Sequence, residues 1–221
     1  MMPPFVQHAI DFLPILLHGA LVTVEVTVLS FVLSSVIGLV LALMRVSPVR
    51  ALRLAAGTLV NLIRGLPIMV QLFYIYFVLP DFGVQLSAFQ AGVIGLGIAY
   101  SAYQAENFRA GIEAVDAGQI EAAQAIGMRL PLIMRRVVLP QAFRIALPPY
   151  GNTLVMMLKD SSLVSTITVA EMTRAGQLIA SSTFQNMTVY TLVALLYLLM
   201  SLPLVFGLHR LEQRLGARKR R

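Results

Sequence analysis

The sequence predicts an all-α integral membrane protein with about five transmembrane helices, and three observations support that prediction. Hydrophobic residues make up 58% of the 221 residues and charged residues only 12%, whereas soluble domains are about half apolar and a quarter charged. The chain also contains five long apolar runs. Its Lys and Arg residues gather in some of the intervening loops and not in others, as they do when loops alternate across a membrane.

Each apolar run approaches or exceeds the length of about 20 residues that a helix needs to cross the hydrocarbon core. The first run ends at Arg45, the second at a Pro-Asp-Phe-Gly turn signal, and the third at Arg109. We expect Pro148 and Pro149 to interrupt the fourth helix, because proline removes a backbone donor and clashes with the preceding turn. The runs cover roughly residues 19–44, 55–79, 87–108, 143–163 and 187–208.

The distribution of charge predicts the orientation. With the N-terminus outside, the 45–53 loop, the 109–140 loop and the C-terminal tail lie in the cytoplasm, and this is the positive-inside pattern. No repeat or shift in composition divides the chain, so residues 1–221 are expected to form a single transmembrane domain. Of the 17 Lys and Arg residues, the three that fall elsewhere are Arg64, Lys159 and Arg174.

The composition argues against several classes of function. The chain has no cysteine and its three histidines have no metal-ligand spacing, so we expect no metal site. Its two lysines, Lys159 and Lys219, do not follow a glycine as the lysine of a phosphate-binding loop does. We therefore expect no enzyme activity and no catalytic residue. The net charge of +7 reflects cytoplasmic loops rather than nucleic-acid binding. The basic tail (210–221) is expected to contact anionic lipid, with a partner protein as the alternative.

The cytoplasmic loop at about 114–140 is longer and more structured than a simple connection requires. We expect a helix from about Glu121 to Ile126 that stops near Gly127. Small alanines allow a partner backbone to approach closely, and an arginine can pair with acidic partner groups. The loop is predicted to dock another protein, and we call residues 114–140 the docking loop. An amphipathic connector lying on lipid is the alternative. The predicted docking residues are Glu121, Ala122, Ala123, Gly127 and Arg129.

A charged cluster, Lys159-Asp160-Ser161, lies within the fourth apolar run. At 1.5 Å per residue, Lys159 lies roughly 20 Å beyond Ile145. A charge at that depth costs at least about 2.5 kcal/mol unless it is paired or faces water. Broken helices with buried polar groups form the midplane sites of transporters, so the cluster is predicted to line a transport path. The alternative is a structural ion pair with Glu171, Arg174 or a neighbouring subunit.

Two further spans carry polar groups. In the second, Arg64 and Gln71 are predicted to face the path, although Arg64 could instead snorkel to the membrane surface. In the third, Tyr100, Tyr103 and Asn107 share one helical stripe, which suits a helix interface as well as a channel. Glu106 lies beside the stripe and can pair with Arg109 three residues on. The complete predicted pathway set is Lys159, Asp160, Ser161, Arg64, Gln71, Tyr103 and Glu106.

The spacing within the loop resembles the EAA loop of ABC importer permeases. It reads Glu-Ala-Ala, three residues, Gly127, nine residues, an aliphatic residue, one residue and Leu-Pro, with Val137 where that family usually has isoleucine. The segments LIRGLPIMVQLFYIYFVLP, LPQAFRIALPPYGN and LKDSSL are similar to the branch of the family that imports polar amino acids. The resemblance runs from about Leu62 to Glu171 and more loosely to the C-terminus.

The resemblance implies a type I importer permease fold and a permease domain spanning residues 1–221. It implies two cytoplasmic ATPase subunits that bind ATP and magnesium, a second identical or related permease, and an external solute-binding protein. It also implies the bacterial cytoplasmic membrane as the location, and a polar amino acid or a derivative such as an opine as the substrate. Glu121, Ala122 and Gly127 would couple the permease to its ATPase, so a bulky residue at Gly127 is expected to uncouple transport. Lys159, Asp160 and Ser161 would contact substrate.

Two hypotheses from other classes are also compatible with parts of the sequence. A secondary transporter driven by an ion gradient would account for charged residues within the spans, but it would not need the docking loop. A membrane scaffold that does not transport would retain the docking loop, but it would not need Lys159 and Asp160 within a span.

Overall fold

The computed structural model describes the backbone of residues 4–217, with side chains from Gln7 to Leu215, and the end of the basic tail (218–221) lies outside the described residues. Every regular element in this described range is helical. The elements are α1 (Pro4–Arg45), α2 (Arg50–Gly65), α3 (Ile68–Phe73), a π-helical turn (Tyr74–Val78), a 3-10 turn (Leu79–Phe82), α4 (Ala88–Glu113), α5 (Ala117–Ala125), α6 (Leu130–Ile133), a π-helical turn (Met134–Val138), α7 (Leu139–Asp160), a 3-10 segment (Ser161–Ile167), α8 (Met172–Thr183) and α9 (Asn186–Ala217).

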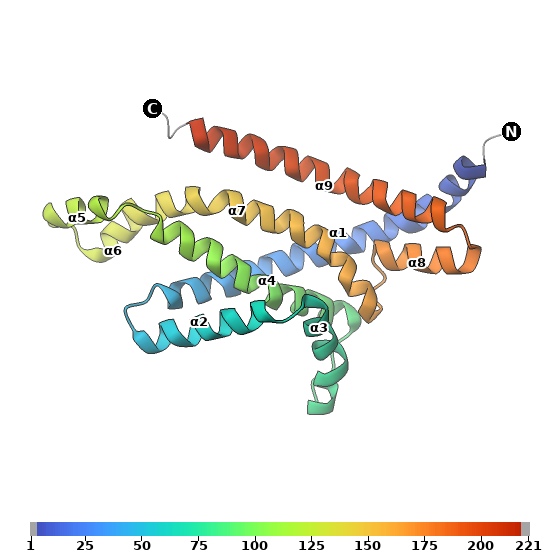
Figure 1. Cartoon of the computed structure of the whole chain (residues 1–221), viewed down its shortest axis with the longest axis horizontal. Helices are drawn as coiled ribbons and strands as arrows, with labels where there is room; N and C mark the ends of the chain where they lie inside the picture. The colour runs from blue at the N-terminus through green and yellow to red at the C-terminus, as the bar shows by residue number, and fades with distance from the viewer. Residues whose placement is uncertain (1–3, 218–221) are drawn as a thin grey trace.

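The long helices form a bundle with α4 near its centre (Figure 1). Helix α4 packs along α1 and against α7, and α9 packs on α7, α8 and α1. The short helices α5 and α6 extend from one end of the bundle, while α3 points away from its long direction (Figure 1). The docking loop and the bent second segment therefore lie at different places on the molecule.

Small residues allow α4 to approach its neighbours closely, as is typical of helices packed within membranes. A Cβ atom on Gly38 of α1 would lie 2.6 Å from the Cβ of Gln104, and one on Gly111 would lie 2.7 Å from the carbonyl oxygen of Ala142 in α7. Another part of α4 contributes the fully buried Leu96 and Tyr100 to the apolar core. Because the backbones are so close, the polar side chains of α4 are brought directly against α1 and α7.

Two predicted boundaries differ from the structure. Helix α1 begins at Pro4 rather than near Gly19, because the apolar sequence before Gly19 continues the helix and accommodates Pro14. The second predicted span is not one helix, since α2 and the segment that begins with α3 meet at a bend of 99°. The physical cause is Pro67, which has no backbone N–H to continue α2 and instead precedes the first turn of α3.

The predicted interruption at Pro148 and Pro149 is wrong, because α7 continues through both residues to Asp160. Proline fixes φ near the helical value and costs mainly its missing hydrogen bond, a loss that membrane helices tolerate. Helix α9 packs closely against this region, since a Cβ atom on Gly151 would lie 2.5 Å from Leu208 Cδ1. The helix changes only after Asp160, where a 3-10 segment ends at Thr168 with a positive φ of 68°.

Length and composition mark two of the described helices, α1 and α9, as able to cross a membrane. The number rises to four if the bent α2–α3 segment and the bent segment from α6 to α8 each count as one span. Helix α4 is not among them, because it carries polar residues along much of its length. Five spans with an external N-terminus therefore stay a prediction.

Candidate functional site

The docking loop contains a short helix, α5, with a defined stop. It begins at Ala117, four residues before the predicted start, because the Asp116 side chain caps it by accepting a hydrogen bond from the Gly118 N–H at 2.8 Å. At the other end Gly127 has a φ of +81°. The N–H groups of Gly127 and Met128 donate to the carbonyls of Gln124 and Ala123. This is a Schellman motif, and it confirms the predicted stop at Gly127.

The docking loop presents some of its predicted contact residues and buries others. Glu121, Ala122 and Arg129 are exposed, and so are Ile126 at 78% and Leu130 at 62%. Ala123 is different, because its side chain is buried in the loop's own small core. Met128 packs against the same core and so helps to hold the loop together. The other buried members of this core are Val115, Ile133, Val138 and Ala142.

A line of polar contacts, which we call the polar seam, runs along α4. At one end the Tyr100 hydroxyl donates to Asp160 Oδ2 at 2.6 Å. The rings of Tyr100 and Tyr103 lie 5.7 Å apart, and the Arg64 guanidinium lies 5.4 Å from the Tyr103 ring centre. Arg64 Nη1 is also 3.9 Å from Glu106 Oε1. The seam therefore joins the end of α7, the middle of α4 and the end of α2.

Glu106 is the most heavily paired member of the seam. Arg109 donates to its Oε2 through Nε at 3.0 Å and Nη2 at 2.7 Å, which confirms the predicted i,i+3 pair. Arg45, the last residue of α1, donates to Oε1. Arg109 also pairs with Glu113. The seam thus extends to α1, a contact that the sequence analysis missed because an arginine at the end of a span reads as a topology anchor.

The charged cluster at the end of α7 forms no ion pair with Glu171 or Arg174, the alternative to a role in the transport path. Lys159 is exposed, and it makes no ion pair within the part of the chain that the structure describes. Asp160 is bound by Tyr100, whereas Ser161 is buried and donates to the Leu158 carbonyl at 2.7 Å. The ion-pair alternative within one chain is therefore wrong for Glu171 and Arg174, and a pair with a neighbouring subunit stays untested.

Gln71 belongs neither to the docking loop nor to the polar seam. Its side-chain amide donates to the carbonyls of Ile63 at 2.9 Å and Leu66 at 3.0 Å. These carbonyls lie at the end of α2, where the helix cannot satisfy them internally. The contacts indicate that Gln71 braces the bend between α2 and α3.

Glu171 is a buried carboxylate that the sequence analysis considered only as an ion-pair partner. It caps α8 by accepting hydrogen bonds from the backbone N–H groups of Thr173 and Arg174, both at 2.8 Å. It also accepts from the hydroxyls of Thr23 on α1 at 3.3 Å and Tyr197 on α9 at 3.0 Å. A carboxylate with four donors is well satisfied without a counter-ion. Glu171 therefore ties three helices together.

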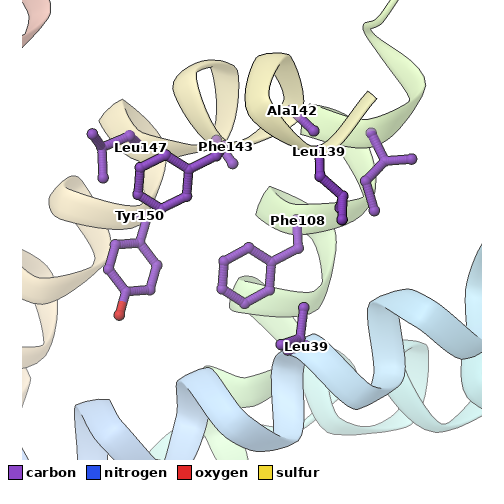
Figure 2. Close-up of a pocket in the computed structure, with 9 residues that line it drawn as sticks. Leu39, Phe108, Leu139, Ala142, Phe143, Leu147 and Tyr150 are labelled. Carbon is purple, nitrogen blue, oxygen red and sulfur yellow. The ribbon is translucent and has the colours of Figure 1, made fainter. Parts of the chain in front are cut away.

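A separate cavity of about 500 Å³ lies between α1, α4 and α7. Figure 2 shows Phe143 and Tyr150 of α7 and Phe108 of α4 projecting toward it. The Tyr150 hydroxyl makes a 3.0 Å hydrogen bond with Ser35. The lining is otherwise apolar, so this cavity does not provide groups that would hold a charged amino acid. Its lining residues are Leu39, Phe108, Ile112, Leu139, Ala142, Phe143, Ala146, Leu147 and Tyr150.

No group of three His, Cys, Asp or Glu side chains able to hold a metal ion gathers among the residues described. Most of the predicted site residues lie in the seam or in the docking loop. A family model described as a binding-protein-dependent transport system inner membrane component matches residues 34–217. The chain belongs to this family. The predicted resemblance and the importer permease fold are confirmed, and the protein is a membrane-bound transport subunit.

Individual relatives of this permease match it over most of its length. The L-cystine transport system permease protein TcyB of Bacillus subtilis (strain 168) is 40% identical over 206 residues, covering 93% of this chain and 88% of that protein. The probable glutamine ABC transporter permease protein GlnM of the same organism is 37% identical over 193 residues, covering 87% and 89%. A crystal structure of an amino acid ABC transporter with histidines aligns with a TM-score of 0.90 and 39% identity, covering 97% of this permease and 100% of that chain.

Proposed function

We propose that this permease is the subunit through which an ATP-driven importer moves polar amino acids, or close derivatives such as opines, across the bacterial cytoplasmic membrane. The names of its relatives, which refer to L-cystine and glutamine transport, support this substrate class. The observation that carries the proposal is the polar seam, a series of contacts that joins Asp160 to Glu106 within a largely apolar protein. Lys159, exposed beside Asp160, belongs to the same proposed path.

The chemistry of the seam suits a zwitterion. A free amino acid carries an ammonium and a carboxylate, and neither can enter hydrocarbon without a large cost. Arg64, Lys159 and Asp160 offer groups of both signs within partly exposed surroundings. Tyr103 adds a polar, aromatic wall. In this proposal Ser161, which is buried and bonded to its own helix, supports the end of α7 rather than binding substrate directly.

The docking loop supports coupling to an ATPase. Its exposed face combines a carboxylate, Glu121, and a guanidinium, Arg129, with the exposed apolar side chains of Ile126 and Leu130. Apolar centres with polar rims are typical of protein interfaces. We infer two cytoplasmic ATPase subunits that bind ATP and magnesium, a second permease, identical or related, and an external solute-binding protein. Residues 1–221 form one permease domain in this assembly.

The mechanism that this assembly supports is alternating access. Partners at the two membrane faces bias an equilibrium between two permease conformations, and each partner can shift it only by its differential affinity for the two. The external protein delivers the amino acid, and ATP binding by the ATPases acts through the docking loop. The permease itself supplies the path and no chemical step.

Gentle affinity purification of the tagged permease from its own membranes tests the assembly. A P-loop ATPase in stoichiometric amount is the expected result, and mass spectrometry of a co-purifying second permease would separate a homodimer from a heterodimer. A preparation without any ATPase, under conditions in which a control importer stays intact, would overturn the proposal.

A substitution tests the path itself. We expect Asp160→Asn to abolish most uptake while the ATPase still co-purifies, because the side chain keeps its shape and loses its charge. Asp81→Asn, in an exposed turn outside the seam, is the matched control and should transport normally. Equal uptake by both variants would remove Asp160 from the path.

A further inference from the structure

The carboxylates of the polar seam are already occupied. Asp160 accepts the Tyr100 hydroxyl at 2.6 Å. Both oxygens of Glu106 are engaged, since Arg45 binds Oε1 while Arg109 binds Oε2 through two nitrogens. Such charge-assisted contacts are among the stronger hydrogen bonds in proteins. Neither carboxylate is therefore fully available to a positive group on a substrate.

The cations of the seam are less fully occupied. The Arg64 side chain is 44% exposed, and its nearest carboxylate oxygen is 3.9 Å away. Lys159 is exposed and without an ion pair among the described residues. When the exposed Lys159 beside the seam is included, basic groups outnumber carboxylates by four to three. They are Arg45, Arg64, Arg109 and Lys159 against Glu106, Glu113 and Asp160.

We propose that the permease selects amino acids with neutral or acidic side chains and rejects those with a cationic side chain, and that Arg45 sets this selectivity by neutralising Glu106. The inference rests on the proposed function, because it assumes that the seam lines the substrate path. A cationic side chain would meet the like charges of Arg64 and Lys159, and their repulsion would disfavour its binding. A carboxylate would instead find both of those groups available.

Arg45 acts through Glu106 rather than by touching the substrate. Arg109 already holds Oε2, and Arg64 forms only a long ion pair with Oε1, at 3.9 Å. Removing the Arg45 charge therefore leaves Oε1 with only this long ion pair and makes the negative charge of Glu106 more accessible. The positive group of a cationic side chain would then be able to pair with Glu106, which Arg45 prevents in the native protein.

The experiment uses the purified permease–ATPase complex without the external binding protein, so that the permease alone makes the selection. Binding of tritiated L-glutamine is measured in competition with L-glutamate and with L-lysine. We expect L-lysine to compete at least about tenfold more weakly than L-glutamate, which corresponds to about 1.4 kcal/mol. Equal competition by the two would overturn the selectivity while leaving the proposed function intact. Loss of binding for all three compounds would instead overturn the path on which both proposals depend.

Two variants test the cause. Arg45→Gln is expected to raise the competition by L-lysine relative to L-glutamate about tenfold, and Tyr100→Phe, which frees Asp160 with little change in volume, should shift the ratio in the same direction. Arg53→Gln is the control, since Arg53 is exposed on α2 near the same end of the bundle and lies outside the seam. A structural role for Arg45 would weaken all ligands together and leave the ratio unchanged. An unchanged ratio in both folded variants would overturn the inference.

Discussion

Replacing Gly127 in the docking loop is expected to uncouple ATP hydrolysis from transport. The sequence predicts this effect for a bulky residue, whereas the structure points to the backbone as the reason. A Cβ atom at Gly127 would meet no other atom within 4 Å, so crowding within the permease is not the cause. The φ of +81° is the constraint, because side-chain-bearing residues pay about 1–2 kcal/mol to adopt left-handed backbone.

That cost is large for this part of the molecule. Helix α5 is only nine residues long, and an isolated helix shorter than about 12 residues is marginal in water. Its order therefore depends on the Schellman bonds at Gly127 and on the packing of Ala123. A change of about 1–2 kcal/mol alters a folded-to-frayed ratio by about 5–30-fold. Gly127→Val should thus leave much of the docking surface misplaced.

The assay is the amount of substrate imported per ATP hydrolysed by the reconstituted complex. We expect this ratio to fall severalfold in Gly127→Val and much less in Gly127→Asn, because asparagine tolerates left-handed backbone better than other residues with a side chain. Both variants introduce a side chain into the same open space. Normal coupling in Gly127→Val, with the ATPase still bound, would refute the backbone argument. Equal loss in both variants would show that the partner surface excludes any side chain there.

Three further predictions concern packing, capping and topology. Gly38→Ala places a Cβ 2.6 Å from a side-chain carbon of α4, so overpacking of about 1–3 kcal/mol should outweigh a helix-propensity gain of about 1 kcal/mol. Gly57→Ala meets nothing within 4 Å and should stabilise. The melting temperatures are measured by circular dichroism, because the chain has neither a Trp nor a Cys side chain to report unfolding. A higher melting temperature for both variants would contradict this prediction. Glu171→Ala should destabilise by about 2–4 kcal/mol through a lost cap and buried hydrogen bonds, and an unchanged melting temperature would argue against that role. An impermeant maleimide should label Gln85→Cys from outside and Ala114→Cys only after permeabilisation, whereas labelling of Gln85→Cys only from inside would mean that the bent second segment returns instead of crossing.

Features set by neighbouring residues could be predicted from the sequence. The turn after the second apolar run closes at Gly83 with a φ of +83°, as its Pro-Asp-Phe-Gly sequence indicates. The stop of α5 at Gly127 and the pair between Glu106 and Arg109 follow equally local rules. In each case a glycine or a three-residue spacing decides the outcome, and no distant contact competes with it.

Features that depend on distant parts of the chain could not be predicted in this way. Arg45 and Glu106 are 61 residues apart, and Thr23 and Glu171 are 148 residues apart. No periodicity in the sequence connects such residues. The continuity of α7 through Pro148 has the same origin, because the helix is supported by packing from α4 and α9. Local propensity alone favours a break there.

The connection between the docking loop and the polar seam lies in two helices. Helix α4 ends at Glu113, four residues before α5 begins, and α7 begins directly after the π-helical turn that follows α6. The loop's own core joins these ends, because Val115 and Ala142 belong to the same cluster. Further along, the same two helices meet again where Tyr100 binds Asp160. A shift imposed on α5 should therefore move the ends of α4 and α7 together at the loop. It should also displace the seam residues on these two helices, because closely packed helices transmit displacement. In the proposed assembly, coupling then requires no flexible relay, only that the loop core stay intact while the ATPase holds its exposed face.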